Sequence, residues 1–338
     1  MGLQIGEIVP KKEVLIKELK GQIIAVDAFN IIYQFLSSIR QPDGTPLQDS
    51  KGRVTSHLSG LFYRNISLLS EGLKLVYVFD GVAPDMKKAT WAKRKEVKNV
   101  AEEKYETAKD EEDIEEMGKY ARQLSVLDKP KIEESKRLLK AMGIPVIQAP
   151  GEGEAQASYI CQQGDAYAVA SQDYDCLMFN SPKLIQNLTL AKKRKTRGGV
   201  VDVTPMMINL KEVLSELEIN QEQLIAIGVL SGTDYNPGGV HGIGQKKALK
   251  LIKELGKLEN VVDKLKADGK EINFNWQEVE KEIKEPNVNK NYKIEFGKFD
   301  FNAVKEIMKE YEFNEERINA QFEKLEVLEE QKKQKTLF

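Results

Sequence analysis

Acidic side chains stand where several apolar runs of this 338-residue chain stop. Asp27 follows IIAV, Asp80 follows LVYVF, and Asp234 follows VLSGT. Two further pairs come after similar runs: Glu152, Glu154, Asp173 and Asp175. The carboxyl ends of the strands in an open parallel α/β sheet open onto one crevice, so we expect these acids to converge there. If the chain is extended at Asp173 and Asp175, both side chains point to one face.

Converging carboxylates repel one another and need a cation. Oxygen ligands with no Cys or His nearby favour Mg²⁺ or Mn²⁺ over Zn²⁺. A cluster of this size is able to hold two ions for in-line attack on a phosphodiester. The residues therefore predict a metal-dependent nuclease. For Glu152 and Glu154 a second explanation stays open, because acids at a helix start complement the helix dipole.

Composition narrows the class of protein. The net charge is only -2, but basic residues cluster at 192–197 and 246–253 while acidic residues cluster at 110–116. Cys161 and Cys176 lack CxxC spacing, which favours buried thiols over a disulfide or a zinc site. No apolar run approaches the roughly 20 residues of a membrane helix. We therefore expect a cytoplasmic protein with no membrane partner, associated with the nucleoid if it is archaeal.

Short β-branched runs alternate with helical patterns along the chain. Strands are expected within 22–30, 74–81, 143–150 and 165–175, and helices within 56–72, 131–143 and 154–164. This alternation predicts an α/β fold with a mostly parallel central sheet and helices on both faces. We expect one nuclease domain over residues 1–330.

Three segments have features that favour binding to nucleic acid. Residues 86–129 are polar and helical, and are either a solvated helix pair or a basic arch beside Asp80. A hairpin with a basic turn is expected after Asp175. Residues 220–256 fit a helix-hairpin-helix, in which Gly242 and Gly244 let phosphate approach the backbone and Lys246 and Lys247 add charge. A glycine-rich turn is also common between ordinary helices.

Aromatic and basic residues on the expected first helices have two interpretations. Phe29 and Tyr33 follow Asp27, and an aromatic ring near the site is able to stack on an unpaired base. Most aromatics at helical spacing belong to the core instead. The same two interpretations apply to Arg64.

Taken together, these residues resemble the flap endonuclease family, its archaeal members most closely. The segments DAFNIIYQFLSSIR, SHLSGLFYRN, VYVFDG, GEGEAQA, ASQDYDCLMF and GTDYNPGGVHGIG occur in the family's order and spacing. The resemblance covers nearly the whole chain. It implies a structure-specific 5′ nuclease of DNA replication and repair that cleaves branched DNA and also has 5′ exonuclease activity.

The resemblance also implies roles for individual residues. The seven acids match the ligands of two catalytic Mg²⁺ ions, for which Mn²⁺ is a substitute. Lys87 and Arg94 match basic residues at the base of the family's helical arch, and Tyr33 matches an aromatic that stacks on substrate. The remaining DNA contacts implied by the resemblance are Gly2, Arg64, Gly239, Gly242, Gly244, Lys246 and Lys247. The hairpin from Gly239 to Gly244 matches a duplex-binding element that also holds K⁺.

Residues 331–338 form the candidate clamp-binding tail. Relatives end in a sliding-clamp motif, and Gln334, Leu337 and Phe338 fit its first part before the chain stops. Starting the motif at Gln331 instead puts Gln334 in the aliphatic position. We expect a mobile tail, and a monomer. Two rival functions remain: a related nuclease with broader exonuclease or bubble-cutting action, and a non-catalytic DNA-binding scaffold for the clamp.

Overall fold

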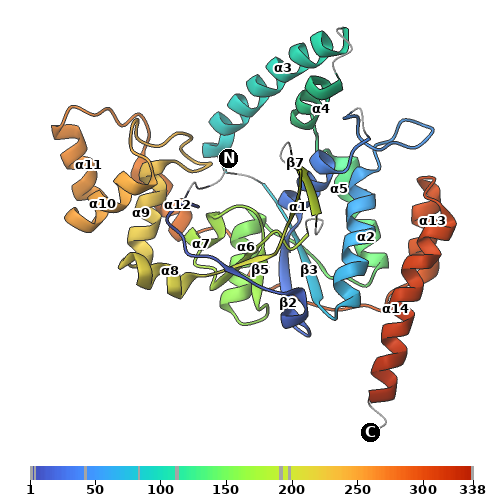
Figure 1. Cartoon of the computed structure of the whole chain (residues 1–338). Helices are drawn as coiled ribbons and strands as arrows, with labels where there is room; N and C mark the ends of the chain where they lie inside the picture. Colours follow the sequence, from blue (N-terminus) through green and yellow to red (C-terminus); the bar gives the residue numbers. More distant parts are fainter. Residues whose placement is uncertain are drawn as a thin grey trace.

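A seven-stranded sheet with strand order β1-β9-β6-β5-β2-β3-β4 forms the centre of the molecule (Figure 1). The computed structural model describes residues 3, 5–41, 44–82, 84–110, 114–189, 193–196 and 199–335. The strands are β1 (Lys12–Glu13), β2 (Ile23–Asp27), β3 (Lys74–Phe79), β4 (Val146–Gln148), β5 (Ala168–Ala170), β6 (Lys183–Gln186) and β9 (Met206–Asn209). Four neighbouring pairs are parallel, and β9 is antiparallel to β6 and β1. The predicted mostly parallel α/β sheet is confirmed.

Alternate side chains of the central strands enter two separate hydrophobic cores. In β2, Ala25 belongs to one core, while Ile24 and Val26 belong to the other. This follows from the two-residue period of a strand, which sends successive side chains to opposite faces. Each face is therefore covered by helices, which explains why these strands read as continuous apolar runs.

Helices from distant parts of the sequence cover the two faces. One face packs against α1 (Ala28–Ser38), α2 (Ser56–Ser70), α5 (Lys129–Ala141), α13 (Phe301–Glu310) and α14 (Glu315–Lys335). The other packs against α6 (Gly153–Gln162), α7 (Asp175–Met178), α8 (Leu210–Leu217), α9 (Gln221–Ser231), α10 (Gln245–Leu255), α11 (Leu258–Ala267) and α12 (Trp276–Lys284). Within the described residues, no helix is long and apolar enough to cross a membrane.

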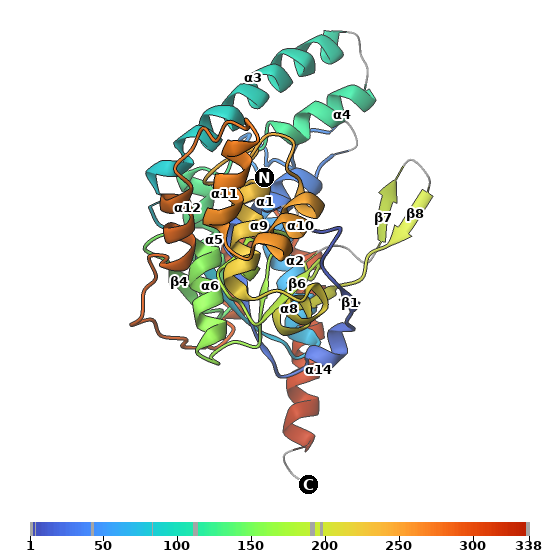
Figure 2. The same cartoon turned by 90° about the vertical axis from the view of Figure 1, so that its left-hand side faces the viewer.

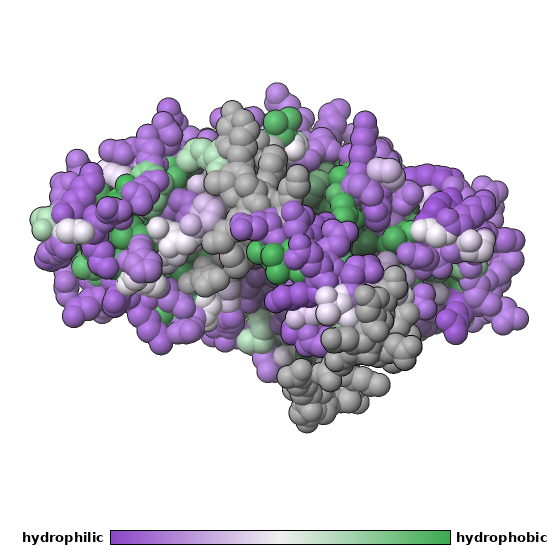
Figure 3. Space-filling model, turned by 90° about the horizontal axis from the view of Figure 1, so that it is seen from above, coloured by the Kyte–Doolittle hydropathy of each residue, from purple (hydrophilic) through white to green (hydrophobic). Residues whose placement is uncertain are grey.

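Two helices stand clear of the sheet over the residues expected to form an arch. These are α3 (Lys88–Asp110) and α4 (Ile114–Gln123), which pack along each other and rise above the body of the molecule (Figures 1 and 2). Ala101, Ala108 and Ala121 are buried in this pair, and small side chains allow close helix contact. Figure 3 views this side and shows hydrophilic residues over most of the surface.

Two hairpin elements flank the arch. The strands β7 (Lys193–Thr196) and β8 (Gly199–Asp202) pair antiparallel and project from the body in Figure 2, where we expected a basic hairpin. On the other side, α9 and α10 enclose the glycine-rich segment 232–244. A capping box of Asn220 and Gln223 begins α9, because each residue satisfies a backbone N–H of the other.

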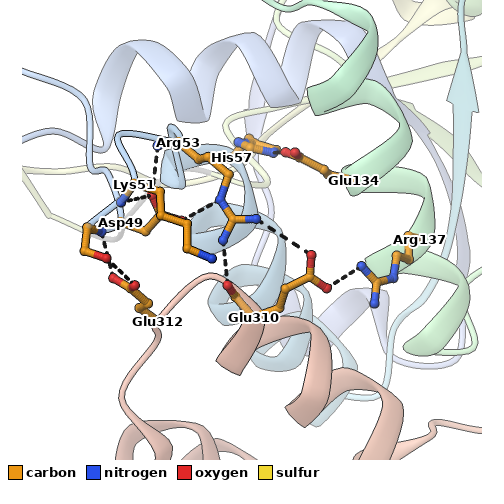
Figure 4. Close-up of polar contacts among 9 residues, drawn as sticks. Asp49, Lys51, Arg53, His57, Glu134, Arg137, Glu310 and Glu312 are labelled. Carbon is orange, nitrogen blue, oxygen red and sulfur yellow. Dashed lines mark hydrogen bonds and ion pairs between the residues drawn. The ribbon is translucent and has the colours of Figure 1, made fainter.

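The C-terminal helices are fastened to the loop between α1 and α2 by a polar latch of Asp49, Arg53, Arg137 and Glu310 (Figure 4). Arg53 Nε donates to Asp49 Oδ2 at 2.6 Å and Arg53 Nη2 donates to the Glu310 carbonyl at 2.6 Å. Arg137 Nη1 donates to Glu310 Oε2 at 2.7 Å. Helix α14 continues to Lys335 and so includes the first residues of the predicted tail from residue 331. Its last turns are Glu, Gln and Lys, which are good helix formers.

Candidate active site

The ends of β2 and β3 bring the first acids together with the start of α6. Asp27 ends β2 and caps α1, and its Oδ1 accepts a hydrogen bond from the Asn30 N–H at 3.1 Å. Asp80 directly follows β3, and its Oδ1 accepts from the Gly153 N–H at 2.8 Å. Glu152 is the N-cap of α6 and Glu154 lies in its first turn. Backbone donors thus orient two of the carboxylates from the strand ends.

The predicted extended geometry at Asp173 and Asp175 was wrong. Strand β5 ends at Ala170, and Asp175 is already the first residue of the short helix α7. Asp173 Oδ2 accepts from Asn30 Nδ2 at 3.0 Å, and the Leu3 N–H donates to Asp175 Oδ1. Both side chains still lie in the same site, because the turn between β5 and α7 positions them. The alternation of a strand plays no part in this.

Asp234 follows helix α9, as the helix-hairpin-helix interpretation expects, and not a strand like Asp27 and Asp80. A local turn fixes its position. Asn236 Oδ1 accepts from the Thr233 N–H at 3.1 Å, and Asn236 Nδ2 donates to the Val229 carbonyl at 2.7 Å. Asp234 Oδ2 then lies 3.8 Å from Lys87 Nζ.

The acids influence one another strongly. Burial, followed by the charge of Asp80, raises the pKa of Asp27 to about 7. Burial and then Asp173 raise the pKa of Asp175 to about 7, and burial raises that of Asp80 to about 6. The pKa of Glu154 also rises well above its usual range, because of burial and then the charges of Asp27 and Asp175. Removing carboxylates from water next to like charges disfavours ionisation, so this site favours a bound cation.

Lys87 supplies a positive charge within this cluster. Its Nζ forms an ion pair with Glu152 Oε1. Burial alone would lower the pKa of Lys87, but the neighbouring carboxylates, Glu152 foremost, raise it above its usual value. Lys87 is therefore protonated in the site, as the predicted role at the reacting phosphate requires.

Tyr235 is a site residue that sequence analysis missed. Its hydroxyl donates to Glu152 Oε2 at 2.7 Å, and Lys87 Nζ lies 5.2 Å from the centre of its ring. Burial and then the charge of Glu152 raise the pKa of Tyr235, so the hydroxyl keeps its proton. Its place next to Asp234 in GTDYN was the only signal in the sequence.

The donor set fits a hard divalent cation. As they stand, no three His, Cys, Asp or Glu side chains in the described residues converge tightly enough to hold an ion. The raised pKa values nevertheless show that these carboxyls interact with each other. Buried carboxylate oxygens are the ligands that Mg²⁺ and Mn²⁺ prefer, so the acids fit such an ion by their chemistry.

The structure also gives contacts for three further residues from the sequence analysis. The Tyr33 ring is 46% exposed, and its hydroxyl donates to the Ser125 carbonyl at 2.9 Å. Phe29 instead packs edge-on against Phe79, with ring centres 6.3 Å apart, as the core interpretation predicted. Arg64 Nη2 donates to the Leu188 carbonyl at 3.2 Å, and burial lowers the pKa of Arg64.

Some predicted residues are only partly described. Arg94 lies in α3 and Gln334 in α14, but the described part of the chain includes no side-chain positions for them. Gly2, Leu337 and Phe338 fall outside the described residues.

Glycines shape the hairpin between α9 and α10. Gly239 has φ 55°, and a Cβ there would lie 2.3 Å from the Leu230 carbonyl oxygen. Gly242 has φ 75°, a conformation that favours glycine. Gly244 is the N-cap of α10, and a Cβ there would meet nothing within 4 Å. Its neighbourhood is therefore open to a ligand.

Two lysines follow the hairpin on α10. Lys246 Nζ lies 2.9 Å from Glu7 Oε2, in an exposed ion pair. Lys247 Nζ donates to the Gly242 carbonyl at 3.1 Å. The Lys247 ammonium therefore lies beside the glycine-rich segment, whereas Lys246 pairs with the N-terminal part of the chain.

Comparison with known proteins identifies the family. Residues 3–101 match the XPG N-terminal domain and residues 143–234 match the XPG I-region. Flap endonuclease 1 of Pyrococcus furiosus is 47% identical over 340 residues, covering 100% of this chain and 98% of that protein. The corresponding Aeropyrum pernix protein is 48% identical over 331 residues, covering 96% and 94%. This chain belongs to the flap endonuclease family.

The solved structures agree with this flap endonuclease assignment. Flap endonuclease-1 from Methanococcus jannaschii matches with a TM-score of 0.76 at 40% identity, covering 98% of this chain and 100% of that one. The catalytic core of Rad2 in complex with DNA substrate shares the fold, with a TM-score of 0.71 at 23% identity. The predicted structure-specific flap endonuclease of replication and repair is confirmed.

Proposed function

We propose that this flap endonuclease binds branched DNA and passes the 5′ single strand under the arch of α3 and α4. It then hydrolyses a phosphodiester near the junction of duplex and flap. The seven acids would hold two Mg²⁺ ions, for which Mn²⁺ substitutes: Asp27, Asp80, Glu152, Glu154, Asp173, Asp175 and Asp234. The ions, when bound, activate water and stabilise the leaving 3′ oxygen.

One observation carries this proposal. Burial, together with the charges of neighbouring carboxylates, raises the pKa of Asp27 and Asp175 to about 7; Asp80 and Asp173 act on Asp27, and Asp173 and Asp234 act on Asp175. Such a cluster costs stability unless a cation compensates it. A structural acid cluster of this kind has no use in a non-catalytic scaffold for a sliding clamp.

Basic and aromatic residues of this chain would act on the DNA directly. Lys87 stays protonated among the acids, so it is available to neutralise charge that develops on the scissile phosphate. Arg94, seven residues further along the arch base, would share this role. The exposed ring of Tyr33 would stack on an unpaired base.

The duplex would bind at the helix-hairpin-helix without sequence readout. Amides near Gly242 and Gly244 would receive phosphate oxygens, and Lys246 and Lys247 would add attraction. Carbonyl groups of the hairpin at Gly239 to Gly244 would hold K⁺. Gly2 and Arg64 would contact DNA nearer to the acids. The protein would act as a cytoplasmic monomer, nucleoid-associated if it is archaeal.

Cleavage mapping tests this function directly. A labelled double-flap substrate should be cut near the junction with Mg²⁺ or Mn²⁺ and left intact with a chelator. Nicked and bubble substrates, compared in parallel, separate flap cutting from broader exonuclease or bubble-cutting action.

A variant pair tests the metal assignment. Asp173→Ala should abolish cleavage while DNA binding persists, because the acid holds an ion and the duplex is gripped elsewhere. Asp263→Ala, an exposed acid on α11, should cut normally. Near-normal turnover of Asp173→Ala in Mg²⁺ would remove this acid from the metal site.

The tail would bind a sliding clamp through Gln334, Leu337 and Phe338. Leu337 and Phe338 are the large apolar side chains of this segment. Losing one large aromatic contact costs on the order of 2 kcal/mol, or more than tenfold in affinity, so removing both side chains should weaken binding by at least that factor. Calorimetry would compare this chain with Leu337→Ala/Phe338→Ala and with a tail extended by an aromatic pair. Equal affinities would show that the tail is not the anchor.

A further inference from the structure

An irregular segment of 16 residues, 285–300, links α12 to α13 and lies against α6; we name it the strap. In Figure 2 it descends beside α6 before it turns toward the C-terminal helices. It has no helix or strand, so its shape depends on contacts with the rest of the chain. Its first part, through Asn287, Asn289 and Tyr292, contacts the helix that carries Glu152 and Glu154 or the residues at its ends, and its last part contacts Ala141 and Gly143.

Gln156 makes a double hydrogen bond with one residue of the strap. This side chain is completely buried. Its Oε1 accepts a hydrogen bond from the Asn289 N–H at 2.6 Å, and its Nε2 donates to the Asn289 carbonyl at 3.0 Å. The carboxamide thus pairs with both backbone groups of one strap residue, as a neighbouring strand would do.

Further contacts follow α6 along its length. A Cβ added at Gly151 would lie 3.1 Å from the Asn287 carbonyl oxygen, so the strap passes close to the start of the helix. Near the other end, the Tyr292 hydroxyl donates to Asp165 Oδ2 at 2.5 Å, and its ring packs edge-on against Tyr159. The strap therefore touches α6 before, within and beyond the helix.

Gln156 is directly connected to the acid at the start of the helix. Its own N–H donates to the Glu152 carbonyl at 3.1 Å, in the first hydrogen bond of α6. A carboxylate about 6 Å from a helix axis moves by about 1 Å when the helix turns by about 10°. Metal ligands tolerate only a few tenths of an ångström, so the rotation of α6 matters for cation binding.

We propose that Gln156 is a positioning residue of the active site. Its paired hydrogen bonds to Asn289 fix the rotation of α6 and thereby the places of the Glu152 and Glu154 carboxylates. This inference rests on the proposed function, in which those two acids hold a divalent cation. The strap begins at the end of α12, and α12 packs on α9 of the proposed duplex-binding element. The contact between Gln156 and Asn289 therefore also links α6 to that element.

The competing interpretation makes Gln156 a structural residue that merely stabilises the fold. The two interpretations differ in cation affinity measured without DNA. Residues that orient metal ligands typically change metal affinity by about 10–100-fold when they are replaced. A purely structural residue would lower the melting temperature and leave the affinity of the folded protein unchanged.

The test uses Gln156→Met, which keeps the volume of the side chain and removes both hydrogen bonds. Calorimetric titration of the full chain with Mn²⁺ should give a dissociation constant at least about tenfold higher than that of the wild type. Tyr292→Phe is the matched control, because it removes a strap hydrogen bond at the far end of α6. It should bind Mn²⁺ as the wild type does. With flap DNA, Gln156→Met should need more Mn²⁺ for half-maximal rate while KM for the DNA stays unchanged.

A second variant covers the case in which Gln156→Met fails to fold. Asn289→Pro removes the N–H that donates a hydrogen bond to Gln156 Oε1, and it leaves the sequence of α6 unaltered. Like Gln156→Met, it should raise the dissociation constant for Mn²⁺. Wild-type Mn²⁺ affinity in either folded variant would overturn the positioning role. A wild-type protein without saturable Mn²⁺ binding would instead overturn the proposed function, and with it this inference.

Discussion

The Tyr235 hydroxyl donates a hydrogen bond to Glu152 Oε2 across 2.7 Å, although the two residues are 83 positions apart. Both side chains are buried. Lys87 forms an ion pair with the other oxygen of the same carboxylate. Glu152 is therefore oriented from two sides, by a neutral donor from the turn after α9 and by a cation from the base of the arch.

Replacing Tyr235 with Phe should reduce single-turnover cleavage by at least about tenfold, because a hydrogen bond to a charged group contributes about 1.5–3 kcal/mol. Rapid-quench measurement at saturating DNA and Mg²⁺ gives this rate. Tyr77→Phe is the control, since Tyr77 loses an equally buried hydrogen bond, 2.7 Å to Asn65 Oδ1, away from the acids. Equal rates for the two variants would contradict a role for Tyr235 at Glu152.

Stability of the metal-free protein should fall as the pH rises. The pKa values of Asp27 and Asp175 are about 7 in the folded chain, above the unfolded value near 4. The folded state therefore binds more protons than the unfolded state between those values, and stability is lost as the pH rises through about 7. Thermal denaturation in a chelator should give a lower melting temperature at about pH 8 than at about pH 5.

Added Mg²⁺ should raise the melting temperature more at the higher pH, because it binds the ionised carboxylates. The variant Asp27→Asn/Asp175→Asn should flatten the pH dependence in the chelator, since the neutral amides do not titrate. A melting temperature that rises with pH in both proteins would contradict the electrostatic account of the cluster.

Lys87→Met should slow single-turnover cleavage by about 100-fold and weaken flap binding little, because in the proposed function its ammonium neutralises charge that develops at the phosphate. Arg94→Met should change the rate in the same direction. Lys119→Met removes an exposed charge from α4 and controls for the overall charge of the arch. A wild-type cleavage rate in Lys87→Met would show that Lys87 serves only as a structural ion-pair partner of Glu152.

Gly242→Ala should weaken duplex binding for all sequences, because a side chain at φ 75° strains the hairpin whose amides are proposed to bind phosphate. Gly256→Ala places the same strain at φ 81° after α10, outside the hairpin, and should bind DNA normally. Dissociation constants are compared at one salt concentration, because phosphate contacts depend strongly on salt. Equal affinities would remove the hairpin from the interface.

Sequence patterns predicted the parts of the fold that depend on local periodicity. Strands β2 and β3 are buried on both faces, and their apolar runs end at Asp27 and Asp80 as expected. The run before Asp234 fitted two predictions, a strand end like those of the other acids and the first helix of the helix-hairpin-helix; the second is confirmed by α9, which is buried from Leu224 to Leu230. At Asp173 the strand is only three residues long, too short for alternation to persist.

Roles that depend on distant contacts were invisible in the sequence. Tyr235 acts on Glu152, and Gln156 meets Asn289 across 133 residues. Neither residue belongs to a pattern of charge or spacing. Only the folded chain reveals which side chain a hydroxyl or a carboxamide will meet.

The spread of the seven acids from residue 27 to residue 234 has a consequence for the cell. If the seven acids hold the metal ions as proposed, a nascent chain on the ribosome carries no complete set of ligands until residue 234 has emerged and α9 has docked. The helices that close the other face arrive later still, with the latch at Glu310. Incomplete chains would therefore lack the proposed metal site and would not cleave DNA. Nuclease activity would appear only after residue 234 has folded into place.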